Sequence, residues 1–524
     1  MTSNAELAGA TLGHLAGLGV SQFVVCAGAR NTPLVSSLLA VSEKKELRIW
    51  HHFDERSASF FALGLSKAKG EPVAVLTTSG TAVAELLPAT IEAYYSGVPL
   101  ILVTADRPAS FRGSGAPQAI EQKGIFGHYA PVSIDVQEAT DLSWVLKWPR
   151  NEPLHLNVCL EEPKAEDRVE DWSEIALPTG DAVHAHADDL SIEAFVANCH
   201  SLVVVLGEIP GDWQETVENF LADLAVPVWA EATSGLRESE RLAPWLLRAE
   251  KEVASLSPRE ILRIGGVPSL RFWRDLEIHR EIEVLSVTRR PFSGLARPSR
   301  HLVVEEFPDL SEWEVGFSQG NKSPKESGSA AALLETLLAS HPNSEPALMR
   351  QLSERIPEEA LVFLGNSLPI REWNLAASPS LSHPHCFANR GANGIDGEVA
   401  TFLGMAEGGP ESWGIFGDLT ALYDLNAPAL LEQLSEGRRR IVVMNNGGGR
   451  IFSRLPSMAG LKASEKKFTE NRHHHCFASW AEMWGLDYLC WKAGEEPPKI
   501  AGDHVLIEIL PDEEATEAFW ADWQ

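Results

Sequence analysis

The stretches Trp413-Gly-Ile-Phe-Gly-Asp418-Leu419 and Ile441-Val-Val-Met-Asn445-Asn-Gly447 decide how the C-terminal part of this chain folds. Each is a short apolar run that ends in a residue with a side-chain oxygen. Between them, apolar side chains recur close to a 3.6-residue period over residues 420–434, which predicts a helix that Pro428 should kink or restart. A strand, a helix and a second strand of this length form a right-handed parallel crossover. Asp418 and Asn445 should therefore lie side by side at the carboxyl edge of one sheet.

Asp418 and Asn445 offer oxygen ligands that suit Mg²⁺, which takes about six hard oxygens and often shares them with the phosphates of a ligand. The backbone carbonyl of Gly447 would add another ligand, because glycine lets the backbone approach closely. The helix that starts after Asp418 favours negative charge at its N-terminus. Each half alone is more often an ordinary turn. At this spacing, and on this strand–helix–strand frame, the two halves together resemble the Gly-Asp…Asn-Asn signature of thiamine diphosphate enzymes.

The composition of the chain excludes some classes of partner. It has 524 residues, of which 44% are apolar, and a formal net charge of −29 from 73 acidic and 44 basic residues. Such a surface repels nucleic acid and anionic membranes, and no basic block offsets it. The six cysteines are scattered without a CxxC pair, as in reduced cytosolic proteins. The N-terminus lacks the features of a signal peptide and no apolar run is long enough for a membrane span, so we expect a cytoplasmic protein.

Short apolar runs alternate with helical patterns in three blocks, which predicts an α/β protein with three doubly wound parallel sheets. We expect domains at residues 1–165, 189–317 and 331–524, joined by an acidic, proline-containing linker at 166–188 and a polar linker at 318–330. No internal repeat is convincing in the sequence. The runs expected to form strands are residues 23–26, 47–51, 73–77, 100–103 and 154–159 in the first block, 202–206, 226–229, 260–264 and 282–286 in the second, and 361–364, 414–416, 441–444 and 504–509 in the third.

Glu55 lies at a second junction of the predicted kind, where the apolar run before it meets a helical pattern. Ligands of open α/β folds bind at this edge of the sheet. An acidic residue is also simply favoured at a helix N-terminus, so Glu55 alone decides little. Thr77-Thr-Ser-Gly-Thr81 is another turn at a strand end. The two segments together favour a ligand-binding role for Glu55 over a simple helix cap. Thiamine chemistry needs a carboxyl group that shares a proton with the aminopyrimidine ring, and burial raises the pKa of such a group.

Several strings resemble, over nearly the whole chain, the family of 2-succinyl-5-enolpyruvyl-6-hydroxy-3-cyclohexene-1-carboxylate synthases of menaquinone biosynthesis. The match is carried by the first and third domains and is weak in the central one. The strings are Asp54-Glu-Arg56, Thr78-Ser-Gly-Thr-Ala-Val83, Thr104-Ala-Asp-Arg-Pro108, Asn389-Arg-Gly-Ala-Asn-Gly-Ile-Asp-Gly397, Gly417-Asp-Leu419, Tyr423-Asp-Leu-Asn426, Asn445-Asn-Gly-Gly448 and Ile451-Phe-Ser453.

This resemblance implies aminopyrimidine-binding, central and diphosphate-binding domains, with thiamine diphosphate and Mg²⁺ as cofactors and Mn²⁺ as an alternative metal. It implies a transferase that decarboxylates 2-oxoglutarate and adds the resulting succinyl-semialdehyde carbanion to isochorismate by conjugate addition. It also implies a homodimer or a dimer of dimers, with each site built at a subunit interface.

The resemblance also assigns roles to single residues. Glu55 would activate the aminopyrimidine, Ile395 would support the bent cofactor, and Asp418, Asn445 and the carbonyl of Gly447 would hold the metal. Both substrates are dianions, and arginine grips a carboxylate with two parallel hydrogen bonds, although any one arginine could be a surface ion pair. Further cofactor contacts fall to Thr78, Ser79, Gly80, Gly417, Leu419, Ile451 and Phe452, and substrate and catalytic contacts to Arg30, Arg107, Gln118, Ser367, Arg371 and Arg390. Ile451, Phe452 and Leu455 match apolar residues that line the same substrate pocket.

The sequence departs from the family at three substrate positions. Ala29 replaces a usual serine, Pro117 an asparagine, and Leu270 a central-domain lysine, with Arg271 beside it. These changes put substrate affinity in doubt more than the reaction. The run Arg472-His-His-His-Cys476 is not expected to bind metal, because consecutive residues cannot easily converge on one ion.

Three alternatives remain in view. Another thiamine diphosphate carboligase or decarboxylase of 2-oxo acids would need fewer arginines, because a monocarboxylate needs one. A catalytically silent homologue would be signalled by loss of Glu55, Asp418 or Asn445, and all three are present. A dinucleotide oxidoreductase lacks support, because no G-x-G-x-x-G follows the first strand of any block.

Overall fold

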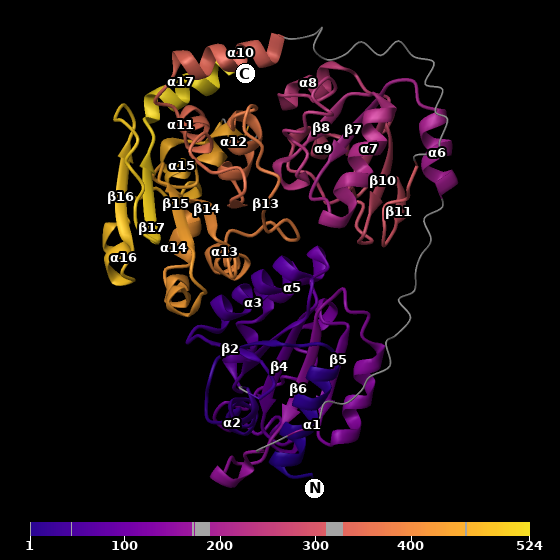
Figure 1. The fold of residues 1–524 in the computed structure, drawn as a ribbon, viewed down its shortest axis with the longest axis vertical. Coiled ribbons are helices and arrows are strands. Elements are labelled where there is room, and N and C mark those ends of the chain that lie inside the picture. The colour runs from indigo at the N-terminus through magenta and orange to yellow at the C-terminus, as the bar shows by residue number, and fades with distance from the viewer. Residues whose placement is uncertain are drawn as a thin grey trace. The chain divides into compact units, whose positions relative to one another are not determined.

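The computed structural model describes residues 2–42, 44–169, 172, 189–310, 329–455, 458 and 460–523. In these residues the chain forms three parallel sheets with helices, which confirms the predicted α/β fold class (Figure 1). The sheets have the strand orders β2-β1-β3-β4-β6-β5, β11-β10-β9-β7-β8 and β13-β12-β14-β15-β17-β16. Because every paired strand is parallel, the carboxyl ends of neighbouring strands meet at one edge of each sheet.

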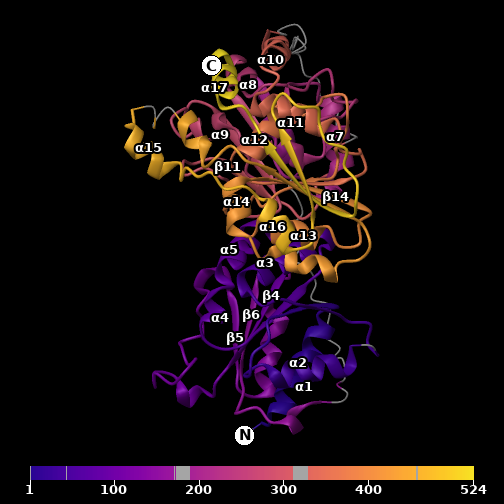
Figure 2. The same ribbon diagram turned by 90° about the vertical axis from the view of Figure 1, so that its left-hand side faces the viewer.

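The first sheet holds its strands between two layers of helices. α1 (Asn4–Gly17) and α2 (Thr32–Val41) share one apolar core with it, while α3 (Glu55–Lys69) and α5 (Leu87–Ser96) lie on the opposite side (Figures 1 and 2). Its strands are β1 (Gln22–Val25), β2 (Arg48–His51), β3 (Val73–Thr77), β4 (Leu100–Asp106), β5 (Val132–Val136) and β6 (Leu154–Cys159).

The second and third sheets follow the same plan. In the second, α6 (Asp189–Ala197) and α7 (Gln214–Leu224) share one core with the strands, and α8 (Glu250–Ser255) and α9 (Arg271–Asp275) share another. The second sheet consists of β7 (Leu202–Leu206), β8 (Val228–Ala230), β9 (Glu260–Ile264), β10 (Glu283–Thr288) and β11 (Arg300–Val303). The third consists of β12 (Leu361–Leu364), β13 (Cys386–Phe387), β14 (Glu411–Gly417), β15 (Arg438–Met444), β16 (Asp487–Lys492) and β17 (His504–Leu510).

The helices of the third sheet frame its ligand edge. α11 (Glu345–Ser353) and α12 (Leu368–Ala376) pack in its core, and α14 (Asp418–Tyr423) starts where β14 ends. The expected helix over residues 420–434 is interrupted: α14 ends at Tyr423 and the chain resumes as the 3₁₀ segment η8 (Ala427–Gln433) around Pro428. Further α-helices are α4 (Thr81–Ala84), which follows β3, and α10 (Ser329–Ser340), α15 (Ala463–Thr469), α16 (Ala478–Met483) and α17 (Glu513–Trp523).

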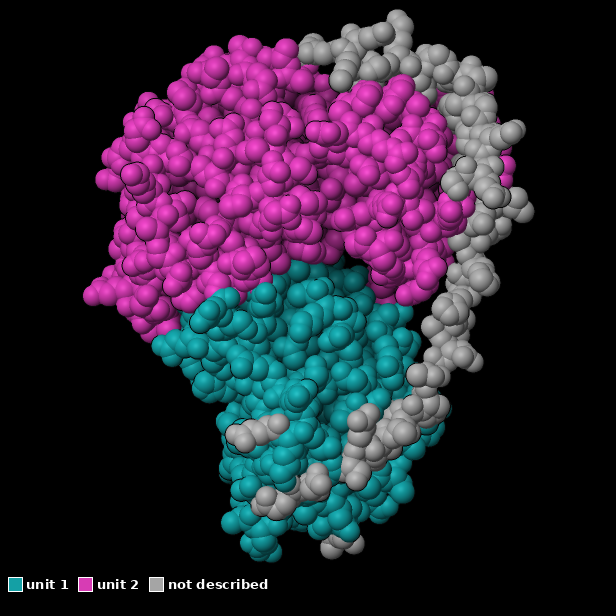
Figure 3. Space-filling view, viewed as in Figure 1, with its two compact units in different colours: residues 1–182, 391–408, 422–436 teal, residues 183–390, 409–421, 437–524 magenta. Residues whose placement is uncertain are grey.

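The chain divides into two compact units (Figure 3). Unit 1 contains residues 1–182, 391–408 and 422–436, and unit 2 contains residues 183–390, 409–421 and 437–524. Unit 1 thus combines the first sheet with α13 (Glu398–Met405) and η8.

α13 packs closely on α3 inside unit 1. A Cβ atom added to Gly64 would lie 2.1 Å from the carbonyl oxygen of Thr401, and one added to Gly404 would lie 2.2 Å from that of Phe61. The two helices can approach this closely only because both positions lack side chains.

The predicted linkers at 166–188 and 318–330 lie mostly outside the described residues, so the domain boundaries stay predictions. Trp172 is 4% exposed in the core of the first sheet, so packing of that domain extends past residue 165. Among the described helices, none has the length and apolar character needed to cross a membrane.

Candidate functional site

The metal-ligand candidates Asp418 and Asn445 follow neighbouring strand ends. β14 and β15 pair in register, with Gly417 opposite Met444, so the next residue on each strand is one of the two candidates. This is the arrangement that the strand–helix–strand pattern predicted. It places a carboxylate and an amide together at the carboxyl edge of the third sheet.

Asp418 is a buried carboxylate with few charges to balance it. It is 2% exposed, and its Oδ1 and Oδ2 accept hydrogen bonds from the amides of Leu419 (2.7 Å) and Gly448 (2.8 Å). Burial raises the pKa of Asp418 to about 6, against the opposing effect of these backbone N–H groups. The Nε2 of His473 lies 3.3 Å from Oδ2, but burial lowers the pKa of that imidazole, so it adds little positive charge at neutral pH. A cation would complete this environment.

Asn445 is oriented by a carboxylate on the next strand. Its Nδ2 donates to Glu508 Oε1 at 2.6 Å and to the carbonyl of His475 at 2.8 Å, which leaves its Oδ1 as the acceptor toward the turn. Oδ1 lies 3.3 Å from the amide of Gly447. The donors of the amide are thus held by protein, and its oxygen suits a cation.

The donor set would suit a metal that is held together with a bound ligand. No group of three or more His, Cys, Asp or Glu side chains in the described part of the chain could hold a metal ion by itself. One carboxylate, one amide oxygen and a backbone carbonyl fit Mg²⁺ only if a bound phosphate group supplies further oxygens.

Glu508 and His473 are functional candidates that the sequence analysis missed. Glu508 is a buried acid within the otherwise apolar strand β17, and its Oε2 also accepts hydrogen bonds from Tyr488 and Phe477. A charged residue inside such a run was the available signal. His473 carried no signal of its own, because nothing in the sequence shows that its amide donates to the carbonyl of Gly447 at 3.2 Å.

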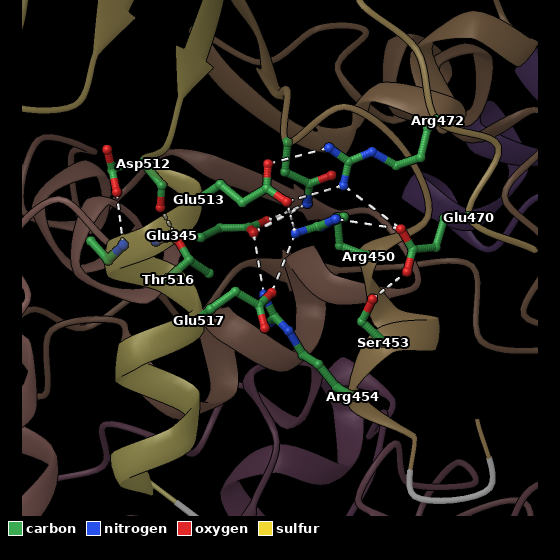
Figure 4. Close-up of polar contacts among 12 residues, drawn as sticks. Glu345, Arg450, Ser453, Arg454, Glu470, Arg472, Asp512, Glu513, Thr516 and Glu517 are labelled. Carbon is green, nitrogen blue, oxygen red and sulfur yellow. Dashed lines mark hydrogen bonds and ion pairs between the residues drawn. The ribbon is translucent and has the colours of Figure 1, made fainter. Parts of the chain in front are cut away.

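The segment after the metal turn carries the apolar candidates Ile451, Phe452 and Leu455, all half-buried. It forms the short 3₁₀ segment η9 (Arg450–Arg454), and the arginines at its two ends are held by acidic residues (Figure 4). Arg450 pairs with Glu470, Glu513 and Glu517, and Arg454 pairs with Glu345 and Glu372.

A cationic corner lies at the carboxyl ends of β12 and β13. Ser367 precedes α12 with φ +71, an unfavourable backbone conformation for serine of the kind that often marks a functional site. Its carbonyl accepts a hydrogen bond from Arg371 Nη1 at 2.6 Å. Arg390 is 9% exposed, and its Nη1 donates to Asn366 at 2.7 Å.

One arginine in this corner leaves a buried donor for an anion, and a second brings its charge close by. Within the described residues, the buried Nε of Arg390 has no hydrogen-bond partner. Burial and the neighbouring charge of Arg390 lower the pKa of Arg371, while Glu231 and Glu250 oppose that effect. Like charges gathered at a strand edge suit a carboxylate ligand.

The first sheet places its candidates in the same way. Glu55 is the first residue of α3, directly after the loop that follows β2, and it is half-buried. Asp54 already caps this helix by accepting a hydrogen bond from Ser57 N at 2.9 Å, so Glu55 is not needed as a cap. Burial raises the pKa of Glu55, as proton sharing with a ligand requires. Thr78, Ser79 and Gly80 follow β3, and Gly80 has φ +88.

The substrate candidates of unit 1 are Arg30, Arg107 and Gln118. Arg30 is 6% exposed and donates to the carbonyl of Leu160 and to Glu162, 2.9 Å away. Arg107 Nε donates to the carbonyl of Pro117 at 3.1 Å, and Gln118 is exposed with φ +56.

Ile395 and Leu270 lie outside the group of arginines at the ends of β12 and β13. Ile395 belongs to unit 1, where it is half-buried. Leu270 is 4% exposed in the core of the second sheet, so this side chain offers a ligand neither charge nor surface. Arg271 beside it faces Asp275 at 3.7 Å.

Known proteins resemble this chain over its whole length. A model of the thiamine pyrophosphate enzyme N-terminal TPP binding domain matches residues 6–125. The chain is 41% identical to the 2-succinyl-5-enolpyruvyl-6-hydroxy-3-cyclohexene-1-carboxylate synthase of Bdellovibrio bacteriovorus, over 99% of both chains. It is 42% identical to the synthase of the same name from Akkermansia muciniphila, over 95% of each chain. Its fold is similar to that of a solved Mycobacterium smegmatis enzyme described as thiamin diphosphate-dependent, with a TM-score of 0.70 at 17% identity, covering 98% of this chain and 99% of the other.

Proposed function

Because the chain belongs to the family of 2-succinyl-5-enolpyruvyl-6-hydroxy-3-cyclohexene-1-carboxylate synthases, we propose that it decarboxylates 2-oxoglutarate and transfers the resulting four-carbon unit to isochorismate. The observation that carries the proposal is the edge of the third sheet, where Asp418 and Asn445 lie in register beside the arginine corner. A divalent metal, a diphosphate and a carboxylate would find complementary groups there. The product would enter menaquinone biosynthesis.

The residues present fit thiamine diphosphate with Mg²⁺ or Mn²⁺. Asp418, Asn445 and the carbonyl of Gly447 would hold the metal, and the amides of the neighbouring turns would face the diphosphate. When bound, the cofactor supplies a thiazolium ring that accepts the electron pair released by decarboxylation. Glu55 would hold a proton at the aminopyrimidine ring nitrogen, and its raised pKa favours that role. Ile395 would support the cofactor by shape alone.

The arginines would select and orient the two dianionic substrates. Arg371 and Arg390 bring two cations to one strand edge, and the buried Nε of Arg390 lacks a partner in the described residues. Each guanidinium can grip a carboxylate through two parallel hydrogen bonds. Arg30, Arg107, Gln118 and Ser367 would complete the substrate contacts. A pyruvate-specific enzyme would need fewer cations, so this second candidate is the weaker one.

Assembly and location are part of the same proposal. Glu55 lies in unit 1 and Asp418 in unit 2, and both must act on one cofactor. By likeness to the family we infer a homodimer or dimer of dimers in which each site takes residues from two subunits. A strongly acidic chain with scattered cysteines fits a cytoplasmic enzyme.

The deciding experiment is a reaction of the purified protein with thiamine diphosphate, Mg²⁺, 2-oxoglutarate and isochorismate. Loss of isochorismate and a product of the expected mass would support the synthase. Replacing 2-oxoglutarate with pyruvate tests the second candidate. If the protein binds the cofactor yet turns over neither 2-oxo acid, a catalytically silent homologue is the better description.

A further inference from the structure

One buried carboxylate touches both ends of the segment that follows the metal turn. Glu345 is 1% exposed, and its two oxygens lie 2.9 Å and 3.1 Å from the Nδ2 of Asn446. The Nη2 of Arg454 lies 3.6 Å from the Oε2 of the same glutamate. Asn446 and Arg454 are the first and last residues of a short segment, 446–454, that contains Gly447, Ile451 and Phe452.

The far end of the segment is held by a second buried acid. Arg454 Nη1 donates to Oε1 of Glu372 on α12 at 2.9 Å, and the side chain of Glu372 is fully buried. Its guanidinium also lies 4.5 Å from the ring centre of Trp520 on α17. Figure 4 shows Glu345 and Arg454 within this cluster of acidic and basic side chains. Asn446 and Arg454, the two ends of the segment that holds Ile451 and Phe452, therefore both contact the buried Glu345.

Helix capping does not account for the position of Glu345. Ser344 already caps α11, accepting a hydrogen bond from the amide of Ala347. An acid at a helix start is ordinarily exposed, whereas two buried carboxylates around one guanidinium are costly unless each group is hydrogen-bonded. Burial raises the pKa of both Glu345 and Glu372, because the interior disfavours the charged form of a carboxyl group. Position 345 thus does more than stabilise a helix end.

We propose that Glu345 is a positioning residue that fixes both ends of segment 446–454 and thereby sets the Gly447 carbonyl in register with Ile451 and Phe452. The inference rests on the proposed function for the role of Gly447, and on the resemblance to the family for the roles of Ile451 and Phe452 at the cofactor and in the substrate pocket. If so, the affinity for the metal and the affinity for isochorismate are coupled, because both depend on the buried carboxyl group of Glu345. The outer contacts of Arg450 with Glu513 and Glu517 are more exposed and contribute less to that coupling.

Hydrogen–deuterium exchange of the cofactor-free protein tests the positioning directly. The amide of Gly448 donates to Asp418, that of Gly449 to the carbonyl of Glu470, and that of Phe452 to the carbonyl of Gly449, so their exchange reports opening of the segment. Glu345→Gln places an NH₂ group against the donors of Asn446 and Arg454. It should speed exchange at both ends of the segment by at least about tenfold, the factor that a hydrogen bond to a charged group contributes. Asn446→Ala should loosen only residues 446–450, and Arg454→Lys only residues 451–455.

Glu411→Gln is the matched control. Glu411 also accepts a hydrogen bond, from Trp413 Nε1, and pairs with Arg438, but at the start of β14, the opposite edge of the same sheet. It should leave exchange in 446–455 unchanged. Unchanged exchange in Glu345→Gln would overturn the proposal, as would equal acceleration throughout β14 and β15. If Glu345→Gln does not fold, the Asn446→Ala/Arg454→Lys double variant replaces it and must loosen both ends.

Kinetics then separate positioning from general damage. Glu345→Gln should weaken Mg²⁺ binding and raise KM for isochorismate by about tenfold or more each, with a smaller fall in kcat. A fall in kcat alone would contradict the coupling. If the wild-type protein shows no synthase turnover, the proposed function fails, and the exchange experiment still decides whether Glu345 holds the segment.

Discussion

Metal binding should weaken steeply below neutral pH, because Asp418 must lose its proton to bind a cation. Burial raises the pKa of Asp418 from 3.8 to about 6. At pH 5 only about a tenth of such carboxyls are ionised, so Mg²⁺ affinity should be about tenfold lower at pH 5 than at pH 7. An ordinary exposed carboxyl would lose less than about 10% of its ionised form over the same range.

The assay is calorimetric titration of Mg²⁺ at saturating thiamine diphosphate between pH 5 and pH 8. Asp418→Ala is the reference, because any pH dependence that remains in it belongs to the cofactor or to other groups. Cofactor retention should also be lost in this variant while the fold persists. Equal affinities and equal pH slopes in wild type and variant would refute the assignment of Asp418 to the metal.

The same pKa fixes the sign of a stability effect in the metal-free protein. The folded pKa lies above the unfolded one, so this contribution to stability is fully present below about pH 4 and is lost as the pH rises through about 6. The loss is at most about 3 kcal/mol, from two pKa units at 1.36 kcal/mol each. Bound metal should restore it.

Three further predictions concern other parts of the molecule. Glu55→Gln should keep cofactor binding but slow hydrogen–deuterium exchange at cofactor C2 by about 10²–10⁴-fold, since an amide cannot share the proton; wild-type exchange rates would contradict the role. Mixed dimers of inactive Glu55→Gln and Asp418→Ala chains should regain activity, because one of their two sites is intact. If verified heterodimers show no activity, each site is built within one chain. Gly404→Ala should lower the free energy of unfolding by about 1–3 kcal/mol because its Cβ would meet the carbonyl of Phe61, while Gly211→Ala, with open space around it, serves as the control in urea denaturation.

The sequence predicted the inner strands of the sheets better than their edges. Predicted runs such as residues 73–77, 154–159 and 202–206 coincide with β3, β6 and β7. The strands that it missed, β5, β11, β13 and β16, all lie at the edges of their sheets. Inner strands of parallel sheets are buried on both faces and therefore read as continuous apolar runs, whereas edge strands keep polar residues and escape this pattern.

In the candidate site too, some features could be predicted from apolar runs and others could not. Asp418 and Asn445 were predictable as neighbours because each directly follows an apolar run and the crossover fixes their order. The contact of Glu345 with both Asn446 and Arg454 was not predictable, because it joins positions about a hundred residues apart through side-chain packing alone. The packing of α13 against α3 depends on two glycines in different parts of the chain, and neither signals its partner.

The first and third sheets use one scaffold twice. Numbered by their order in the chain, the strands of both sheets are arranged 2-1-3-4-6-5, although no repeat is visible in the sequence. The candidates occupy equivalent places: Glu55 and Arg390 come after the second strand, and Thr78 and Asp418 after the third. A backbone topology fixes where strand ends converge but leaves the residues there free. One sheet can therefore present a carboxyl group that shares a proton, and the other a metal ligand. A chain with both of these sheet edges suits a cofactor whose two ends differ chemically.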